Sequence, residues 1–120
     1  MITIDDGSVQ IHIARTSVNA LQLNIRTGFN LVYLFQKVKF SITLSNQEFA
    51  QFQQALQAGV KAVIGHKSFW QTHTITVLQK NHPNQYRDIR LYKRSFMVAV
   101  LVVPVTLSQV VVKGILEATL

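Results

Sequence analysis

Residues 38–49 constrain the fold most tightly, because a strand pattern there runs directly into a helix start. Apolar and polar side chains alternate up to Leu44, which is the pattern of a strand with one buried face. Ser45 and Glu48 then have capping-box spacing, in which a hydroxyl accepts from a helix amide and a carboxylate reaches back to the cap. We therefore predict a strand that buries one face under the following helix and exposes the other face, which carries Lys39.

The same alternation recurs along most of the chain and indicates an α+β fold. Strands are predicted at 9–13, 21–25, 69–78, 86–92 and 96–103, with turns at 16–19, 81–84 and 93–95. The run 29–44 fits either one bent strand or two strands reversed near Gln36 and Lys37. Helical spacing predicts helices from 46 to about 64, with Gly65 as a stop, and from 106 to about 120, after a strand that Pro104 ends.

Each half of the chain thus shows antiparallel strands followed by one helix. We predict one compact domain over residues 1–120, built of two antiparallel sheet-then-helix units at 1–65 and 66–120. The two halves share little sequence identity, so the repeat is one of architecture.

Basic residues outnumber acidic ones by 12 to 5, which gives a formal net charge of +7. This excess favours a polyanionic partner such as nucleic acid, an acidic protein or an anionic membrane surface. The chain has no cysteine, which excludes disulfides and thiolate metal sites. Its apolar runs are too short to cross a bilayer, and its acidic start is unlike a signal peptide, so a soluble, intracellular protein is expected.

The segment Ile-Thr-Leu-Ser-Asn-Gln-Glu-Phe at 42–49, preceded by Lys37 and Lys39, resembles the end of the DNA-binding domain of the transcriptional coactivator positive cofactor four. Ser41 and Phe40 stand where that family has a glycine and a basic residue. The doubled layout is similar to the Whirly and PUR single-strand binders. The resemblance implies a curved antiparallel sheet that binds single-stranded nucleic acid.

A single-strand binder needs cations along the phosphates and flat side chains that stack on bases. The predicted nucleic-acid-binding residues are Arg26, Lys37, Lys39, Trp70, Tyr86, Arg87, Arg90, Tyr92, Lys93 and Arg94, with Tyr33 as a further stacking candidate. Residues 86–94 interleave aromatic and basic side chains most densely. An ordinary solvated face fits the same charges. The pattern favours single-stranded DNA or RNA as the partner, bound with little sequence preference.

Chemistry beyond binding has little support in the sequence. The histidines, at 12, 66, 73 and 82, offer no close ligand pair, and we expect no metal and no cofactor. No nucleophile elbow or phosphate-binding loop is present, and five acids supply no obvious carboxylate pair, so an enzyme is not expected. A small ligand-binding domain or enzyme, with a pocket between sheet and helices, is the third possibility.

Residues 96–103 are apolar on both strand faces, and three valines follow one another at 110–112. A sheet covered by helices on one side leaves its other face in water. This strand is therefore either central in the core or covered by another subunit, and we expect a homo-oligomer. The main alternative function follows: a protein-interaction or assembly subunit that docks a partner through 96–103 and the C-terminal helix.

Overall fold

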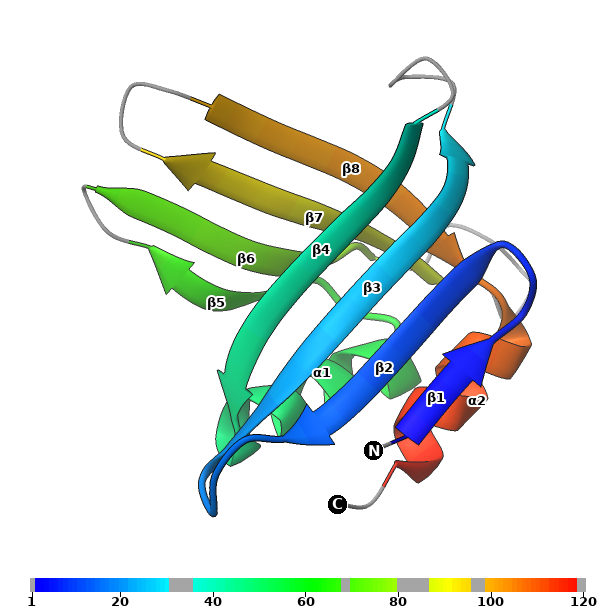
Figure 1. Cartoon of the computed structure of the whole chain (residues 1–120). Coiled ribbons are helices and arrows are strands. Elements are labelled where there is room, and N and C mark those ends of the chain that lie inside the picture. Colours follow the sequence, from blue (N-terminus) through cyan, green and yellow to red (C-terminus); the bar gives the residue numbers. More distant parts are fainter. Residues whose placement is uncertain (1, 31–35, 68–69, 80–86, 96–98, 119–120) are drawn as a thin grey trace.

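The computed structural model describes residues 2–30, 36–67, 70–79, 87–95 and 99–118. It contains two four-stranded antiparallel sheets, each followed by one helix (Figure 1). The first sheet has the order β1 (Ile2–Asp5), β2 (Val9–Arg15), β3 (Ala20–Asn30), β4 (Gln36–Ser45) and is followed by α1 (Asn46–Ala58). The second has the order β5 (Ala62–Lys67), β6 (Gln71–Val77), β7 (Arg87–Ser95), β8 (Ala99–Leu107) and is followed by α2 (Gln109–Glu117). The predicted α+β class with two sheet-then-helix units is confirmed.

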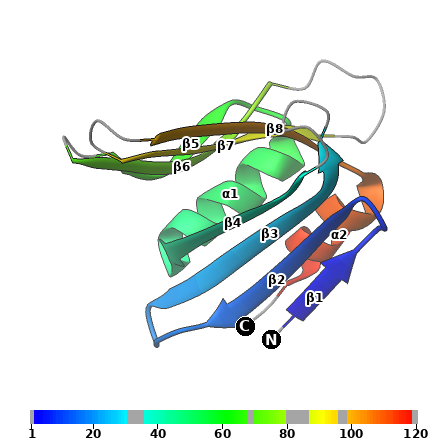
Figure 2. The same ribbon diagram turned by 45° about the horizontal axis from the view of Figure 1, so that its top comes forward.

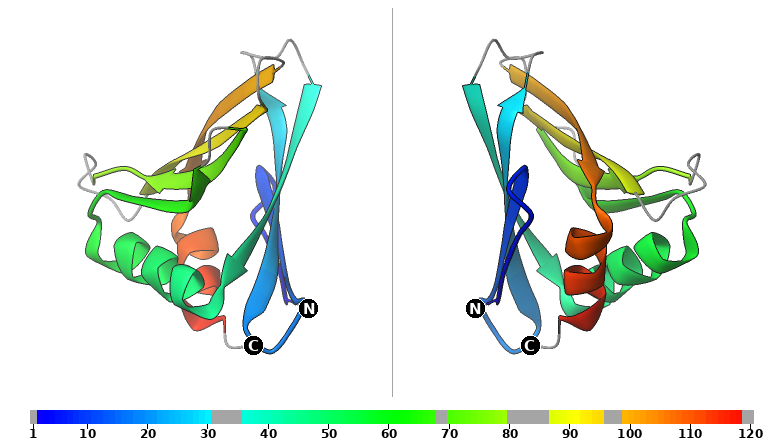
Figure 3. Two further views of the ribbon diagram at one scale, coloured as in Figure 1. Left: turned by 90° about the vertical axis from the view of Figure 1, so that its left-hand side faces the viewer. Right: turned by 90° about the vertical axis from the view of Figure 1, so that its right-hand side faces the viewer.

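The two sheets lean together at one end of the molecule and diverge at the other, where both helices lie between them (Figure 3). In Figure 2, α1 runs beneath the second sheet and behind the first. One apolar core results, because each sheet turns its apolar face towards the helices. Phe52 of α1 is completely buried in it, and truncation to alanine is expected to cost roughly 3–5 kcal/mol. Each sheet keeps an outer face that points away from the helices.

Helix α1 begins where the sequence predicts but ends earlier. The Oγ of Ser45 accepts a hydrogen bond from the Glu48 amide at 3.1 Å, and the Ser45 amide donates to the Glu48 carboxylate at 3.0 Å. Gly59 ends the helix in a left-handed conformation (φ 69°), and its amide donates to the carbonyl of Ala55. The prediction of a helix to about 64 is wrong, because glycine adopts this conformation without the usual steric cost. The boundary between the two units consequently lies near residue 60.

Other predicted boundaries also shift. Strand β8 continues through Pro104 to Leu107, because β8 is an edge strand and proline there loses no essential ladder bond. Residues 93–95 complete β7 instead of forming a turn, and β1 and β5 were not predicted. Antiparallel pairing of β3 with β4 selects two strands over one bent strand for 29–44, with the reversal outside the described residues. The predicted turn at 81–84 also lies outside them.

Helix α2 begins at Gln109, three residues later than predicted, behind the cap Ser108. The Ser108 hydroxyl donates to Asp6 at 2.6 Å, which ties this helix start to the turn between β1 and β2. Burial raises the pKa of Asp6, but the hydrogen bonds from Ser108, Val9 and Ser8 outweigh burial and lower this pKa to about 2. In the described part of the chain, no helix is long and apolar enough to span a membrane.

The two sheets touch where β4 crosses β5 and β6. The rings of Phe40 and His73 meet edge to face there, with centroids 4.9 Å apart. Gly65 has a φ of 130°, and a Cβ at this position would lie 2.3 Å from the carbonyl oxygen of His73 and 3.1 Å from Ile42. The closest clash is with β6, the neighbouring strand of the same sheet, and the contact with Ile42 is the one to the other sheet, so only a residue without a side chain fits at this position.

Candidate nucleic-acid interface

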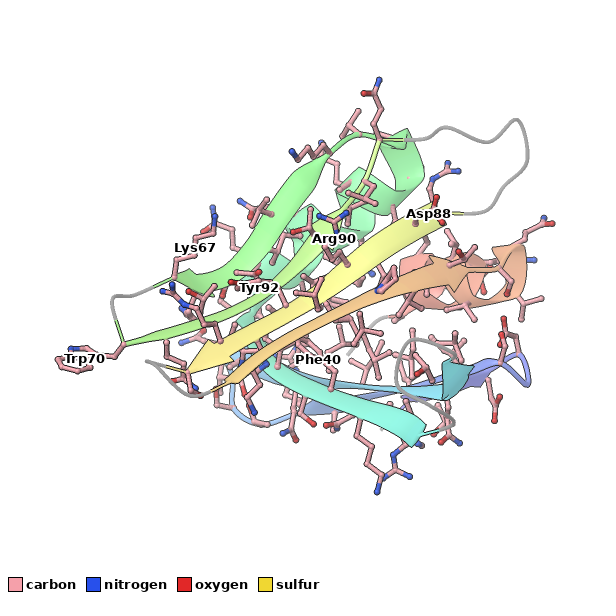
Figure 4. The ribbon with its side chains drawn as sticks, turned by 90° about the horizontal axis from the view of Figure 1, so that it is seen from above. Phe40, Lys67, Trp70, Asp88, Arg90 and Tyr92 are labelled. Carbon is pink, nitrogen blue, oxygen red and sulfur yellow. The ribbon has the colours of Figure 1, made fainter. Side chains whose placement is uncertain are left out.

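The outer face of the second sheet gathers basic and aromatic side chains, and we call it the basic face. It is formed by Lys67, Arg90, Tyr92 and Arg94, with the threonines Thr72, Thr74 and Thr76 between them. Strand register builds it: Thr72 pairs with both Lys67 and Arg94, Thr74 pairs with Tyr92, and Thr76 pairs with Arg90. Figure 4 shows Lys67, Tyr92 and Arg90 following one another across this sheet.

Alternation along β7 decides which of its side chains reach the basic face. Ile89 and Leu91 are completely buried and point towards the helices. The alternate residues Arg90, Tyr92 and Arg94 therefore point outward, since successive side chains of a strand take opposite faces. Arg90 and Arg94 are exposed, and Tyr92 lies half-buried between them. The result is a phenol ring flanked by a guanidinium group on either side along one strand.

A shallow hollow of about 330 Å³ lies on the basic face, between Tyr92, Lys67 and Arg94. Thr72 and Thr74 line it and are only 7% and 3% exposed although they point outward. Their burial follows from the longer side chains of their neighbours, whose apolar stems cover sheet surface while their charges stay in water. The hollow thus has hydroxyl groups along its base and cations at its rim.

The positive charges of the basic face are uncompensated. Within the described residues, Lys67, Arg90 and Arg94 form no ion pair and no hydrogen bond. Among the described residues, a carboxylate on the same face is Asp88, two residues before Arg90 at the start of β7, where it accepts a hydrogen bond from the Thr106 hydroxyl at 2.9 Å. A polyanion can therefore bind these three cations without breaking an existing ion pair or hydrogen bond.

Several predicted residues lie elsewhere. The Nε of Arg87 donates to the carbonyl oxygen of Leu56 at 2.7 Å, so Arg87 points inward to the end of α1. Lys93 also lies on the inner side of β7, in register with His73. Arg26 and Lys39 lie on the outer face of the first sheet, on another side of the molecule.

Among the remaining predicted residues, Trp70 has a described side chain. Trp70 is 66% exposed and lies just before β6, at the tip of the β5–β6 hairpin (Figure 4). Lys37 belongs to β4, but its side chain lies outside the described residues, as do Tyr33 and Tyr86. Lys67 was not predicted, because residues 62–67 were not recognised as a strand. Lys67 and Arg94 lie in one row across the sheet, on either side of Thr72, and this neighbourhood follows only from strand pairing.

Two of the histidines lie closer together in the fold than their spacing in the sequence suggested. His66 and His73 are direct cross-strand partners, although they are seven residues apart in the chain. The Nε2 of His73 is buried and has no hydrogen-bond partner within the described residues. Burial, and then the nearby charges of Lys93 and His66, lower the pKa of His73. The described residues contain no group of three or more histidine, aspartate or glutamate side chains that could hold a metal ion.

Comparisons with known proteins leave function to be inferred from these residues. No protein-family model matches the chain, and no curated protein and no solved structure matches it.

Proposed function

We propose that this protein binds single-stranded nucleic acid, DNA or RNA, across the basic face, with little sequence preference. The observation that supports this most strongly is Tyr92, flanked on the same face by Arg90 and Arg94. Single-strand binders combine cations that follow the backbone with aromatic rings on which bases stack. The basic face supplies both within three strands, whereas the described side chains of the other outer face include no tyrosine, phenylalanine or tryptophan ring.

The spacing of the cations fits the backbone of an extended nucleic-acid single strand. Arg90 and Arg94 are four residues apart, about 13 Å along β7, and Tyr92 lies midway. Lys67 lies two strands from Arg94, about 10 Å across the sheet. A nucleic-acid single strand that lies over the hollow can therefore stack one base on Tyr92 and place the neighbouring phosphates against the cations.

The same arrangement favours single strands over duplexes. In a duplex the faces of the bases are stacked on one another, so Tyr92 can stack only on an unpaired base. Threonine hydroxyls donate and accept equally, and such groups do not distinguish strongly among bases. Low sequence preference is expected for that reason.

Fluorescence anisotropy of labelled single-stranded and double-stranded oligonucleotides at several salt concentrations tests the proposal. We expect the single strand to bind more tightly and its affinity to fall as salt rises. Three neutralised phosphates give a slope of about −2 in a plot of log affinity against log salt. No binding of the single strand at low salt, or equal binding of both probes, rejects the proposed function.

A second candidate function is assembly with a protein partner, including another copy of this chain. The observation in its favour is the edge strand β5, where Val63 is 48% exposed, with Val60 exposed just before the strand and Trp70 exposed at its other end. Exposed apolar edge strands invite pairing with another strand. Within the docking segment predicted from sequence, Val103 is buried in the core, whereas Val110 of the C-terminal helix is 63% exposed. Light scattering as a function of protein concentration, with Val63→Lys as the variant, distinguishes an oligomer from a monomer.

A further inference from the structure

Two cations lie side by side on the outer face of the first sheet. Arg26 of β3 and Lys39 of β4 are direct cross-strand partners, and both are exposed. Like charges directly opposite each other destabilise an antiparallel pair, because their Cβ atoms are only about 5 Å apart. Within the described residues, neither side chain forms an ion pair or a hydrogen bond. An anion bound between them would convert this repulsion into attraction.

A hollow of about 370 Å³ adjoins this pair and is lined also by His12, Asn24 and Ser41. Those three residues form the neighbouring row of the sheet, since Asn24 pairs with both His12 and Ser41. Among the described residues that line this hollow there is no carboxylate. Its volume exceeds what a phosphate group needs and lies in the range of small-ligand sites.

The hydrogen bonds within that row leave donors available for a ligand. The Ser41 hydroxyl donates to the side-chain Oδ1 of Asn24, so the two N–H donors on the Nδ2 of Asn24 remain. The Nδ1 of His12 is engaged by the Thr3 hydroxyl at 3.0 Å, which leaves Nε2 as the second ring nitrogen. The hollow therefore combines two cations with neutral donor groups, a combination suited to an anion.

A second hollow, of about 410 Å³, lies on the other side of the pair and differs in charge. It is lined by Asp5 as well as by Arg26 and Lys39. The Asp5 carboxylate repels an anion, although it already accepts a hydrogen bond from the Gly7 amide at 2.8 Å. An anion held by Arg26 and Lys39 is therefore expected on the side of His12.

We infer that Arg26 and Lys39 bind the phosphate of a phosphomonoester, whose remaining part occupies the hollow beside His12, Asn24 and Ser41. A phosphomonoester carries a charge of about −1.5 to −2 at neutral pH, which matches two cations. The guanidinium group can bind phosphate oxygens in pairs, and the ammonium group adds a point charge. The phosphate comes either from a free phosphorylated sugar or nucleoside, or from the terminal phosphate of a nucleic acid. This inference does not depend on the proposed function, because the two sites lie on different sheets.

Calorimetry at low salt with adenosine 5′-monophosphate, ribose 5-phosphate and adenosine tests the inference. Both phosphates should bind, and adenosine should not. Arg26→Gln and Lys39→Gln should each weaken binding at least about tenfold, which is the effect of losing one charge-assisted hydrogen bond. Lys61→Gln, at an exposed lysine outside both candidate sites, is the matched control and should leave phosphate binding unchanged.

A second measurement shows that the variants remain folded and tests the repulsion itself. Without ligand, Arg26→Gln and Lys39→Gln should melt at the same temperature as the wild type or slightly above it, because each removes a like-charge contact. The inference is overturned if adenosine binds as tightly as its monophosphate, if both phosphates fail to bind, or if both variants bind the phosphates as well as the wild type does.

The source of the phosphate can be identified in the Arg90→Gln/Arg94→Gln background, which weakens the basic face. Oligonucleotides with a 5′-phosphate are compared with the same oligonucleotides ending in a 5′-hydroxyl. A preference for the phosphorylated end supports the inference with a nucleic-acid terminus as the source. Equal weak binding of both oligonucleotides, together with tight binding of the monophosphate, supports it with a free small molecule as the source.

Discussion

The Nε of Arg87 lies 2.7 Å from the carbonyl oxygen of Leu56 and donates a hydrogen bond to the last turn of α1. The last turn of this helix contains no basic residue of its own, and its final carbonyl groups lack partners within the helix. Arg87 supplies the positive charge from β7 instead, where it also favours the negative end of the helix dipole. A side chain of the second unit thereby completes the helix of the first.

The first prediction concerns this contact. Arg87→Ala should lower the free energy of unfolding by about 1.5–3 kcal/mol, the range for a hydrogen bond to a charged group. It should leave single-strand affinity nearly unchanged under conditions where the variant is folded, because Arg87 points away from the basic face. Urea unfolding measures the first effect and anisotropy the second. Arg90→Ala should show the reverse pattern, and a large loss of affinity in Arg87→Ala would place that residue in the interface.

The second prediction concerns the ring of Tyr92. Tyr92→Ala should weaken single-strand binding by about 1–3 kcal/mol, the range measured for base–aromatic stacking. Tyr92→Phe should retain most of the affinity, because the ring stays and only the hydroxyl is lost. Anisotropy titrations of the two variants at one salt concentration make the comparison. Equal losses in both variants would indicate that the hydroxyl acts, and not the ring.

The third prediction concerns the crossing of the two sheets. Gly65→Ala should be severely destabilising, because a Cβ there would lie 2.3 Å from the backbone oxygen of His73 in addition to an unfavourable φ of 130°. Gly7→Ala is the control: Gly7 also has positive φ, at 90°, but has no atom within 4 Å of its Cβ position. The free energy of unfolding of the control should therefore fall only by the cost of the positive φ, roughly 1–3 kcal/mol. Equal unfolding midpoints in denaturant would show that the crossing tolerates a side chain.

The fourth prediction concerns pH and His73, whose pKa is lowered by burial and by the nearby charges of Lys93 and His66. An unfolded histidine binds a proton near pH 6.5, whereas folded His73 resists protonation. The contribution of neutral His73 to the free energy of unfolding is therefore fully present above about pH 6.5 and is lost as the pH falls below this value. Urea unfolding at pH 7.5 and pH 5.5 should show a larger loss for the wild type than for His73→Phe, which keeps a ring beside Phe40. An equal loss in both would assign the acid sensitivity to other groups.

Local patterns in the sequence were sufficient to predict the strand-to-helix transition at 38–49. Alternation, the cap at Ser45 and helical spacing all depend on neighbours in the chain, and the structure confirms each. Strand β5 could not be predicted in the same way, because Val63 continues the helical spacing of α1. What stops the helix is the left-handed conformation of Gly59, and what makes β5 a strand is its pairing with β6.

The candidate site was predictable only in part, for a related reason. The interleaved aromatic and basic side chains at 86–94 drew attention to this stretch, but they did not separate Arg90, Tyr92 and Arg94, which share the outward face, from Arg87, which points inward. The expected turn at 93–95 concealed that Lys93 belongs to the opposite face. No local pattern specifies how two sheets are placed in space, so the separation of Arg26 and Lys39 from the basic face required the fold.

Two double variants with the same net charge provide the most direct test of the basic face. Arg90→Gln/Arg94→Gln and Arg26→Gln/Lys39→Gln each remove two positive charges, but from different sheets. The measurement is the affinity of each for a single-stranded oligonucleotide with a 5′-hydroxyl end, at one low salt concentration. We predict a loss of more than about tenfold for the first variant, as expected when two phosphate contacts are removed, and a loss of at most a few fold for the second. Equal losses in the two variants, or a greater loss in the second, would contradict binding at the basic face.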